Sequence, residues 1–426
     1  MEDRGVSDCR KWYILGILTF INIMGTIDRA VISVIAEPLK QAFGLTDAQI
    51  GVLGGLGYSA TYAIAVLPSG WMVDRWNRRN LIGVSVVIWS GLTALCAASS
   101  SYMLLLLARL GVGAAEAPTV PGTMSLIADT FPVHRRNTAV SLYYAGVALG
   151  QVVIFLVGGW LLLYFDWRTV FLVAGAPSIL LAMLLLFTTR EPARGVMDAG
   201  GSPAENPGPI ERRALLDVGR SLWANRPLMI SIPAIALCSG VPYAVTTWST
   251  SFFVRIHHMS VSEGLMWTGI GFGLCMAAGS LLVGPMADRY SRGDTRRLAL
   301  VPAAATAMAI VAGSLMLLGR TSAEAVIGLG LFSFLCGFFY ASGYSIALQL
   351  ARADERGTTM AVVRLATSLF GGLIPFVTGA LSDFFGGPGS IKLALLFTVL
   401  LLAISSICFM WIRAILKVRI ERPIAT

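Results

Sequence analysis

"GWMVDRWNRR" (Gly70–Arg79) and "GPMADRYSRGDTRR" (Gly284–Arg297) are two versions of one short, charged loop in a chain of 426 residues. Two further segments also occur twice and in the same order. They are "FGLTDAQIG" (Phe43–Gly51) with "HHMSVSEGL" (His257–Leu265), and "FPVHRRNTAV" (Phe131–Val140) with "ADERGTTMAV" (Ala353–Val362). Three elements repeated in one order predict that the chain consists of two similar halves.

Long apolar runs separate these polar segments. The chain is 56% hydrophobic and only 13% charged, and each run is long enough to cross about 30 Å of hydrocarbon as a helix. The runs are continuous rather than alternating, which favours helices over a closed barrel. The predicted spans are Trp12–Ala36, Ile50–Trp71, Leu81–Ser99, Met103–Ser125, Ala139–Leu163, Val170–Thr188, Leu228–Phe253, Leu265–Met286, Leu298–Leu318, Ala325–Leu348, Met360–Leu381 and Ile391–Ile412. The sequence therefore predicts an all-α membrane protein with twelve transmembrane helices.

The formal net charge of +9 is explained by membrane topology rather than by nucleic-acid binding. Most Lys and Arg residues fall in the segments 4–11, 75–79, 135–136, 190–226, 289–297, 352–356 and 413–422. Because successive spans cross the membrane in opposite directions, all these segments lie on the same side of the membrane. The opposite side holds Lys40, Arg168, Arg255, Arg320 and Lys392. The positive-inside rule then predicts that both termini are cytoplasmic, and that the basic segments meet anionic lipid headgroups.

The apolar pattern stops between residues 190 and 226, where Gly, Pro and charged residues dominate. This predicts an amino-terminal six-helix bundle over residues 1–189, a cytoplasmic linker over 190–226 and a carboxyl-terminal bundle over 227–426. Repeated halves of this kind are typical of secondary transporters, whose substrate site lies between the halves.

The cysteine and histidine positions argue against a metal centre and an enzyme. The six Cys are scattered without a Cys-x-x-Cys motif, and the three His lie near loops. No nucleophile–base pair is visible within a span. We expect no metal, no cofactor and no catalytic residue.

The pattern G-x-x-x-D-R-x-x-R-R between the second and third spans resembles the signature loop of the major facilitator superfamily. This resemblance implies two six-helix bundles around a central cavity that works by alternating access. It also implies that the loop acts as a conformational latch rather than a ligand site. The expected latch residues are Asp74, Arg75 and Arg78 in the first half, Asp288 and Arg289 in the second, and Asp129 with Arg136 on the same face.

Four charged residues lie deep within predicted spans, and Arg364 lies less deeply. Asp28 and Arg29 are adjacent in the first span, whereas Arg109 and Glu116 lie seven residues apart in the fourth. A charge at the bilayer centre costs about 2.5–3.5 kcal/mol on insertion scales, so each must face a partner or a wet cavity. Adjacent helical residues point about 100° apart, so Asp28 and Arg29 need separate partners.

Depth along the helices predicts one of these partners. Asp28 lies roughly 25 Å above the cytoplasmic start of its helix at 1.5 Å per residue. Arg109 is at a similar depth on an oppositely directed helix, and Glu116 lies below it. The sequence predicts an Asp28–Arg109 pair with Glu116 nearby, and it leaves the partner of Arg29 open.

Such a cluster suits proton coupling, because opening and closing a cavity changes the balance between desolvation and ion pairing. We therefore predict Asp28 and Glu116 as proton-coupling residues. Arg29 and Arg109 are predicted to bind substrate, since arginine holds carboxylate or phosphate groups well. The alternative is a static ion-pair network that stabilises the amino-terminal bundle.

The carboxyl-terminal half offers aromatic rather than charged candidates. "GVPYAVTTWSTSFF" in the seventh span and "LFSFLCGFFYASGY" in the tenth predict Tyr243, Trp248, Phe338 and Tyr340 as substrate-binding residues. Their alternative role is packing between helices or against lipid. A charged wall facing an apolar one would suit an amphipathic substrate.

The stretch "LLLARLGVGAAEAPTVPGTMSLIADTFPVHRR" resembles the spinster branch of the superfamily, whose members are sphingolipid and lysophospholipid transporter-like. That branch combines Asp-Arg in the first span with R-x-G-V-G-x-G-E-A in the fourth, and Ala115 replaces one Gly here. The resemblance implies that Asp28 and Glu116 couple protons to a lipid-like substrate. The alternative branch is that of anion:cation symporters, which carry sugar acids.

These resemblances imply a multi-pass protein of the bacterial inner membrane that acts as a monomer. Its partners would be a small-molecule or lipid substrate, protons and membrane lipids, but no nucleic acid. An alternative from another class is a receptor that binds ligand without transporting it.

Overall fold

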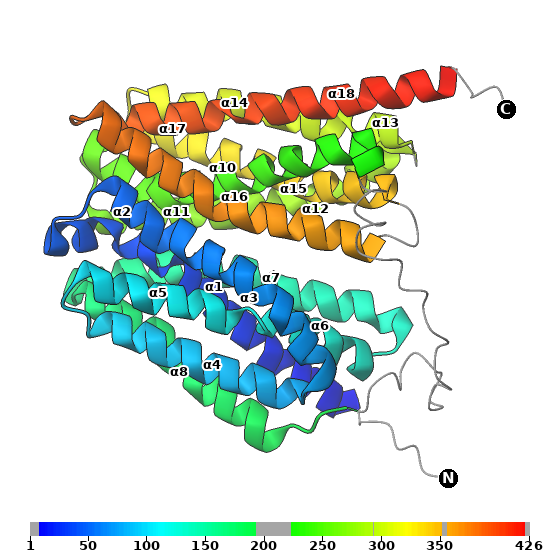
Figure 1. The fold of residues 1–426 in the computed structure, drawn as a ribbon. Helices are drawn as coiled ribbons and strands as arrows, with labels where there is room; N and C mark the ends of the chain where they lie inside the picture. The colour runs from blue at the N-terminus through cyan, green and yellow to red at the C-terminus, as the bar shows by residue number, and fades with distance from the viewer. Residues whose placement is uncertain (1–7, 193–222, 293, 352–355, 422–426) are drawn as a thin grey trace, which may run out of the picture. The chain divides into compact units, whose positions relative to one another are not determined.

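The computed structural model describes residues 8–192, 223–292, 294–351 and 356–421. These residues form helices joined by short turns, with no strand among them (Figure 1). The described residues divide into two compact units. Unit 1 contains residues 8–43 and 57–192, and unit 2 contains residues 44–56 together with everything described from 223 onward.

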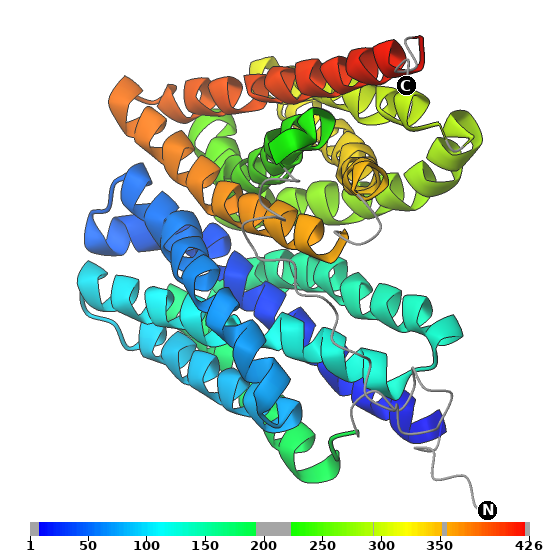
Figure 2. The same cartoon turned by 45° about the vertical axis from the view of Figure 1, so that its right-hand side comes forward.

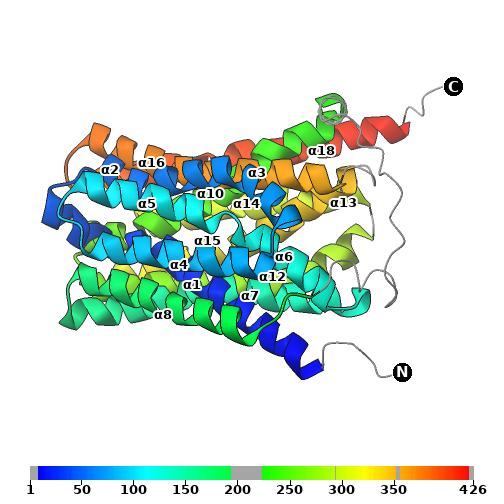
Figure 3. The ribbon, with the colours of Figure 1, turned by 60° about the horizontal axis from the view of Figure 1, so that its bottom comes forward.

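Unit 1 consists of seven helices in the range that the structure describes. They are α1 (Asp8–Phe43), α3 (Gly57–Arg75), α4 (Arg78–Ala97), α5 (Tyr102–Glu116), α6 (Thr119–Thr130), α7 (Val133–Tyr164) and α8 (Trp167–Thr188). α1 packs against α7 and α8, and α4 packs against α5 and α8 (Figure 3). Their common core is apolar and includes Trp89, Phe131 and Tyr143, so burial of apolar surface stabilises this unit.

Unit 2 contains the remaining elements. They are α2 (Asp47–Gly51), η1 (Val52–Leu56), α10 (Arg226–His257), α11 (Val261–Thr268), η2 (Gly269–Leu274), α12 (Cys275–Ser291), α13 (Thr295–Leu298), α14 (Leu300–Leu318), α15 (Ser322–Leu350), α16 (Arg356–Phe385), α17 (Ser390–Leu400) and α18 (Leu402–Glu421). α10 packs against α15, α16 and α18, and the red α18 also packs against α14 (Figure 2). Trp248, Phe252 and Phe332 are fully buried among these helices.

Residues 44–56 join α1 to α3 in the chain yet belong to unit 2. The predicted linker over 190–226 lies mostly outside the described residues, so the predicted bundle boundaries remain a prediction. The structure adds a different crossing point. The chain passes from unit 1 into unit 2 after α1 and returns at α3.

Eleven described helices are long and apolar enough to cross a membrane. They account for the predicted spans except Ile50–Trp71, which is helical but is formed by parts of α2, η1 and α3. Large apolar side chains such as Ile64, Phe187 and Leu281 are more than 70% exposed, which suits helices that face lipid. The fold is that of an all-α membrane protein, as the sequence predicts.

One pair of repeated segments, Phe43–Gly51 and His257–Leu265, has the same local structure in both copies. Thr46 and Gln49 form a capping box at the start of α2, and Ser260 and Glu263 form one at the start of α11. Each short α-helix then continues into a π-helical turn, η1 or η2. A π-helical turn reflects a local insertion into the helical hydrogen-bond pattern and is often associated with function.

α12 and α15 approach each other closely at two glycines. A Cβ atom on Gly279 would lie 2.0 Å from the carbonyl oxygen of Phe334, and one on Gly337 would lie 2.4 Å from the amide nitrogen of Ser280. Because the obstructing atoms belong to the backbone, the helices would have to move apart to admit a methyl group.

We predict that Gly279→Ala destabilises the protein by roughly 1–3 kcal/mol, the usual cost of overpacking. The measurement is thermal unfolding of the purified protein in detergent. Gly91→Ala on α4 is the matched control, since no heavy atom lies within 4 Å of its added Cβ and alanine is the better helix former. Equal unfolding temperatures for Gly279→Ala and the wild type would contradict the close packing.

Candidate functional site

The four deep charges of the amino-terminal half lie on two helices of unit 1. Asp28 and Arg29 are in the middle of α1, and Arg109 and Glu116 are on α5, where Glu116 is the last residue. α5 ends there because Pro118 follows, and a proline ring disfavours continuation of the helix. The chain resumes as α6 at Thr119. The carboxylate of Glu116 therefore lies at a break between two helices.

Asp28 forms the first pair, with Arg109. The Nη1 atom of Arg109 lies 3.1 Å from Oδ2 of Asp28 and 3.3 Å from its backbone oxygen. The Thr93 hydroxyl on α4 donates to Oδ1 of Asp28 at 2.5 Å. The side chains of Arg109 and Asp28 are 0% and 2% exposed. This pair links α1, α4 and α5 in a sealed environment.

Arg29 forms the second pair, with Glu116. Its Nη1 atom donates to Oε1 of Glu116, and its Nη2 atom donates to the Thr26 hydroxyl at 3.0 Å. The Tyr58 hydroxyl on α3 donates to the other carboxylate oxygen, Oε2, at 2.6 Å. This second cluster links α1, α3 and α5.

The two pairs differ in their access to the surroundings. The Arg29 side chain is 25% exposed, whereas the Arg109 side chain is fully buried. Adjacent residues on a helix point about 100° apart, which lets neighbours serve two separate pairs. Arg29 is therefore the more exposed of the two arginines.

Two glycines allow the second cluster to form. A Cβ atom on Gly25 would lie 2.8 Å from Oε1 of Glu116, and one on Gly113 would lie 2.4 Å from the backbone oxygen of Tyr58. Gly25 leaves room on α1 for the carboxylate, and Gly113 lets α5 approach α3. Because neither glycine has a side chain, Tyr58, Glu116 and Arg29 can come into contact.

The predicted Asp28–Arg109 contact is present in the structure. Glu116, which the sequence places near that pair, forms its own ion pair with Arg29, the residue whose partner the sequence left open. Tyr58, Thr93 and Thr26 were not predicted. They are uncharged, and neither apolar periodicity nor charge depth distinguishes them from other residues of their helices.

The aromatic candidates lie in unit 2 with different surroundings. Trp248 is fully buried and its indole donates to the Pro375 oxygen at 3.0 Å, so it packs α10 against α16 and faces no open space. Tyr243 is half-buried and donates to the Gly54 oxygen at 3.3 Å. Phe338 is half-buried, with its ring 5.2 Å from that of Phe334. The side chain of Tyr340 lies outside what the structure describes.

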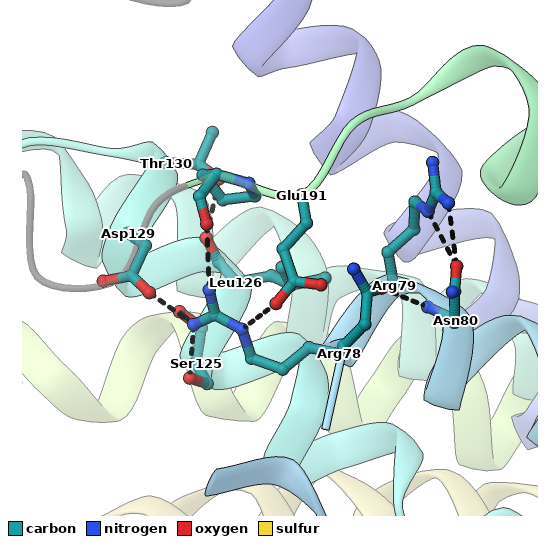
Figure 4. A network of polar contacts seen from close by, with 10 residues as sticks. Arg78, Arg79, Asn80, Ser125, Leu126, Asp129, Thr130 and Glu191 are labelled. Carbon is teal, nitrogen blue, oxygen red and sulfur yellow. Dashed lines mark hydrogen bonds and ion pairs between the residues drawn. The ribbon is translucent and has the colours of Figure 1, made fainter. Parts of the chain in front are cut away.

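The first signature loop forms a polar network within unit 1 (Figure 4). Arg78, at the start of α4, is buried and donates to Asp129, to Glu191 at 2.9 Å and to the Ser125 hydroxyl at 2.8 Å. Its Nη2 atom also donates to the Pro192 oxygen at 3.1 Å. The network joins the start of α4 to the end of α6 and to the segment after α8.

The other predicted latch residues are less constrained in the described part of the chain. Arg75 is exposed, with its guanidinium 4.3 Å from the ring centre of Trp71. Arg289 is exposed. The side chains of Asp74, Arg136 and Asp288 lie outside the described residues, so the latch role remains a prediction.

A further charged cluster, which the sequence did not predict, holds residues 44–56 within unit 2. Asp47 accepts two hydrogen bonds from Arg255, at 2.7 and 2.9 Å, and one from the Ser382 hydroxyl at 2.7 Å. Asp383 accepts from the backbone nitrogens of Asp47 and Ala48 at 2.9 and 2.7 Å. Two carboxylates therefore fix the start of α2 to α10 and α16.

We predict that Asp47→Asn lowers the stability of the protein by about 3 kcal/mol, since it removes one charge of a largely buried ion pair. Thermal unfolding in detergent measures the effect. Asp166→Asn is the control, because the Asp166 side chain is 58% exposed and its ion pair with Arg168 is 4.0 Å long, a kind of pair that contributes little. An equal effect of the two substitutions would contradict a stabilising role for the cluster of Asp47, Arg255 and Ser382, called here the Asp47–Arg255 clasp.

The chain matches the family model described as Major Facilitator Superfamily over residues 18–321 and 266–425. A crystal structure of a bacterial homolog of the human lysosomal transporter spinster, inward-facing and unoccupied, is 27% identical. It superposes with a TM-score of 0.86, covering 96% of this chain and 98% of that chain. Most of the chain therefore shares both sequence features and fold with these proteins.

Two curated relatives are also similar. An "MFS-type efflux pump" of Mycolicibacterium smegmatis is 30% identical over 379 residues, covering 88% of this chain and 85% of the relative. A protein of Bacillus subtilis named as a probable galactarate/D-glucarate transporter is 28% identical over 297 residues, covering 65% of each. These proteins are transporters and not enzymes. The chain belongs to the major facilitator superfamily, and it is a membrane-spanning transporter with a small-molecule substrate.

Proposed function

We propose that this protein is a proton-coupled secondary transporter that works by alternating access, and that Arg29 and Glu116 form its exchangeable site. The observation that carries the proposal is the partly exposed Arg29–Glu116 ion pair, which adjoins the sealed Asp28–Arg109 pair on the same helix. The substrate is an amphipathic or anionic solute, which binds where Arg29 is accessible.

The chemistry of the pair limits how it can open. Arginine does not release its proton in proteins, so Arg29 stays positively charged throughout the cycle. Glu116 can leave Arg29 only if it gains a proton or if another anion takes its place. Protonation of Glu116 and binding of an anionic group to Arg29 are therefore linked, and the linkage acts equally in both directions.

Asp28 has a different part in the same proposal. Its pair with Arg109 is sealed and is reinforced by Thr93, so water reaches Asp28 only when α1 and α5 separate. Because Asp28 precedes Arg29 in one continuous helix, a change at Asp28 turns or shifts Arg29 as well. We assign Asp28 the second proton-coupling position and Arg109 the role of holding it in place.

Similarity to relatives supports the proposed substrate class. The spinster homolog aligns over nearly the whole chain, which favours a lysolipid or related lipid whose charged head binds Arg29. The alternative is a sugar acid, as the name of the Bacillus subtilis relative indicates for that protein. Its carboxylate would bind Arg29 in the same way.

We further propose that the protein resides in a bacterial inner membrane and acts as a monomer. A receptor that binds ligand without transport is the alternative from another class. Ligand-driven proton flux into proteoliposomes separates the two, since a receptor binds the ligand but moves no protons.

We predict that Glu116→Gln and Asp28→Asn each lower uptake driven by a pH gradient by about tenfold or more, within the range of ordinary coupling energies. Each substitution keeps the shape of the side chain but removes the group that exchanges a proton. Substrate exchange without a gradient should be retained by Glu116→Gln. The assays use purified protein in proteoliposomes, with and without an imposed gradient.

The control is Glu324→Gln at the start of α15, where Glu324 is exposed and belongs to a capping box that Gln also satisfies. It should transport like the wild type. Wild-type gradient-driven uptake by both Glu116→Gln and Asp28→Asn would refute proton coupling through these residues. Loss of exchange as well as gradient-driven uptake in Glu116→Gln would instead show that Glu116 is needed for binding.

We predict that lysophospholipids raise the unfolding temperature of the wild type and that Arg29→Gln abolishes this shift. Galactarate and glucarate are tested in parallel at matched concentrations. Stabilisation by the sugar acids alone would reject the lipid substrate in favour of the symporter alternative. A shift by lysophospholipid that Arg29→Gln leaves intact would reject Arg29 as the binding group.

A further inference from the structure

Four arginines of unit 2 line one cavity of about 430 Å³, together with Tyr290 and Leu300. The arginines are Arg289, Arg292, Arg297 and Arg413. They come from the end of α12, the turn after it, α13 and α18, which the chain brings together at one end of the unit (Figure 1). All four side chains are exposed.

This cavity has a strong positive charge, since none of its lining residues is acidic. Asp294, the N-cap residue of α13, is already engaged. Its carboxylate accepts hydrogen bonds from Arg296 at 2.9 to 3.2 Å, and these bonds lower the pKa of Asp294 below its usual value. Asp294 therefore pairs mainly with Arg296, which is not one of the lining residues, and its charge acts more weakly on Arg297, which is one.

An apolar groove adjoins the basic cavity. A second cavity of about 520 Å³ shares Tyr290 and Leu300 with the first and continues between α14 and α18. The small side chains of Ala303, Ala304 and Ala307 leave its floor open, and Met410 lines its other wall. Of its two hydroxyl-bearing residues, Tyr290 is shared with the basic cavity, and the Ser406 hydroxyl already donates to the Ala303 oxygen at 2.9 Å.

Basic and apolar parts are thus joined end to end on the outer surface of a membrane-spanning unit. The positive-inside rule places the segments 289–297 and 413–422 at the cytoplasmic side, where anionic lipids carry a negative surface potential. Arginine holds phosphate oxygens through paired N–H donors. A diacyl lipid matches this arrangement, because its phosphate and its acyl chain are joined in the same order.

We propose that this pair of cavities is a binding site for an anionic phospholipid of the cytoplasmic leaflet, separate from the Arg29–Glu116 site. The phosphate binds the four arginines, and one acyl chain lies along the alanine-lined groove between α14 and α18. The lipid bridges α12, α13 and α18, and it is not the transported substrate.

The test measures lipid retained by the full-length protein in native mass spectrometry after incubation with phosphatidylglycerol or with phosphatidylcholine. We expect at least fivefold more retention of phosphatidylglycerol. The double variant Arg297→Gln/Arg413→Gln should weaken its binding by about 30-fold, at about fivefold for each arginine near an anionic headgroup. Ala307→Phe, which fills the groove, should also weaken phosphatidylglycerol binding.

Arg168→Gln/Arg320→Gln is the matched control, since it removes the same charge from exposed positions outside the cavity and should leave retention unchanged. Arg297→Lys/Arg413→Lys keeps the charge and should retain most of the binding, which distinguishes loss of the site from loss of folding. Equal retention of the two lipids, or wild-type retention by Arg297→Gln/Arg413→Gln, would overturn the proposal. Complete displacement of phosphatidylglycerol by inorganic phosphate would overturn it too, because the site would then take a soluble anion without need of the groove.

Discussion

An arginine within a membrane-spanning helix keeps its charge, and the surrounding structure has to compensate for it. Unit 1 contains two such residues at depth, Arg29 and Arg109, and supplies one carboxylate for each. Removing either partner would leave a buried charge uncompensated, at a cost of about 3–5 kcal/mol. This requirement fixes the position of α1 against α5 and recruits α3 and α4 through Tyr58 and Thr93.

The same requirement produces two pairs that differ in exposure. Asp28 and Arg109 are sealed, so opening them means separating two helices. Arg29 is one-quarter exposed, so the Arg29–Glu116 pair can open by local movement of two side chains. The break between α5 and α6 lies at Glu116 itself, and a helix end offers the backbone freedom that such movement needs. The Arg29–Glu116 pair, which can move more easily, thus lies beside the sealed Asp28–Arg109 pair.

The sequence predicted the fold because long apolar runs, the positive-inside asymmetry and the duplicated loops all indicate one architecture. It predicted the Asp28–Arg109 contact because helical rise converts residue number into depth. Depth alone does not give the direction of a side chain around its helix, which is why the sequence left the partner of Arg29 open. Tyr58 and the Asp47–Arg255 clasp depend on which helices meet, and that information is not contained in local pattern. The packing of residues 44–56 with unit 2 escaped prediction for the same reason.

The duplicated signature loop shows how surroundings change the use of one motif. In the first copy, Arg78 is buried and meets the carboxylates of Asp129 and Glu191, so its charge is consumed within unit 1. In the second copy, Arg289, Arg292 and Arg297 line an open cavity with Arg413 and without an acid among the lining residues. An arginine that is paired with carboxylates of its own unit holds helices together, whereas an exposed arginine without such a partner attracts anions. The motif is therefore a source of positive charge in both halves, and its effect depends on whether the neighbouring helices bring acidic residues to it.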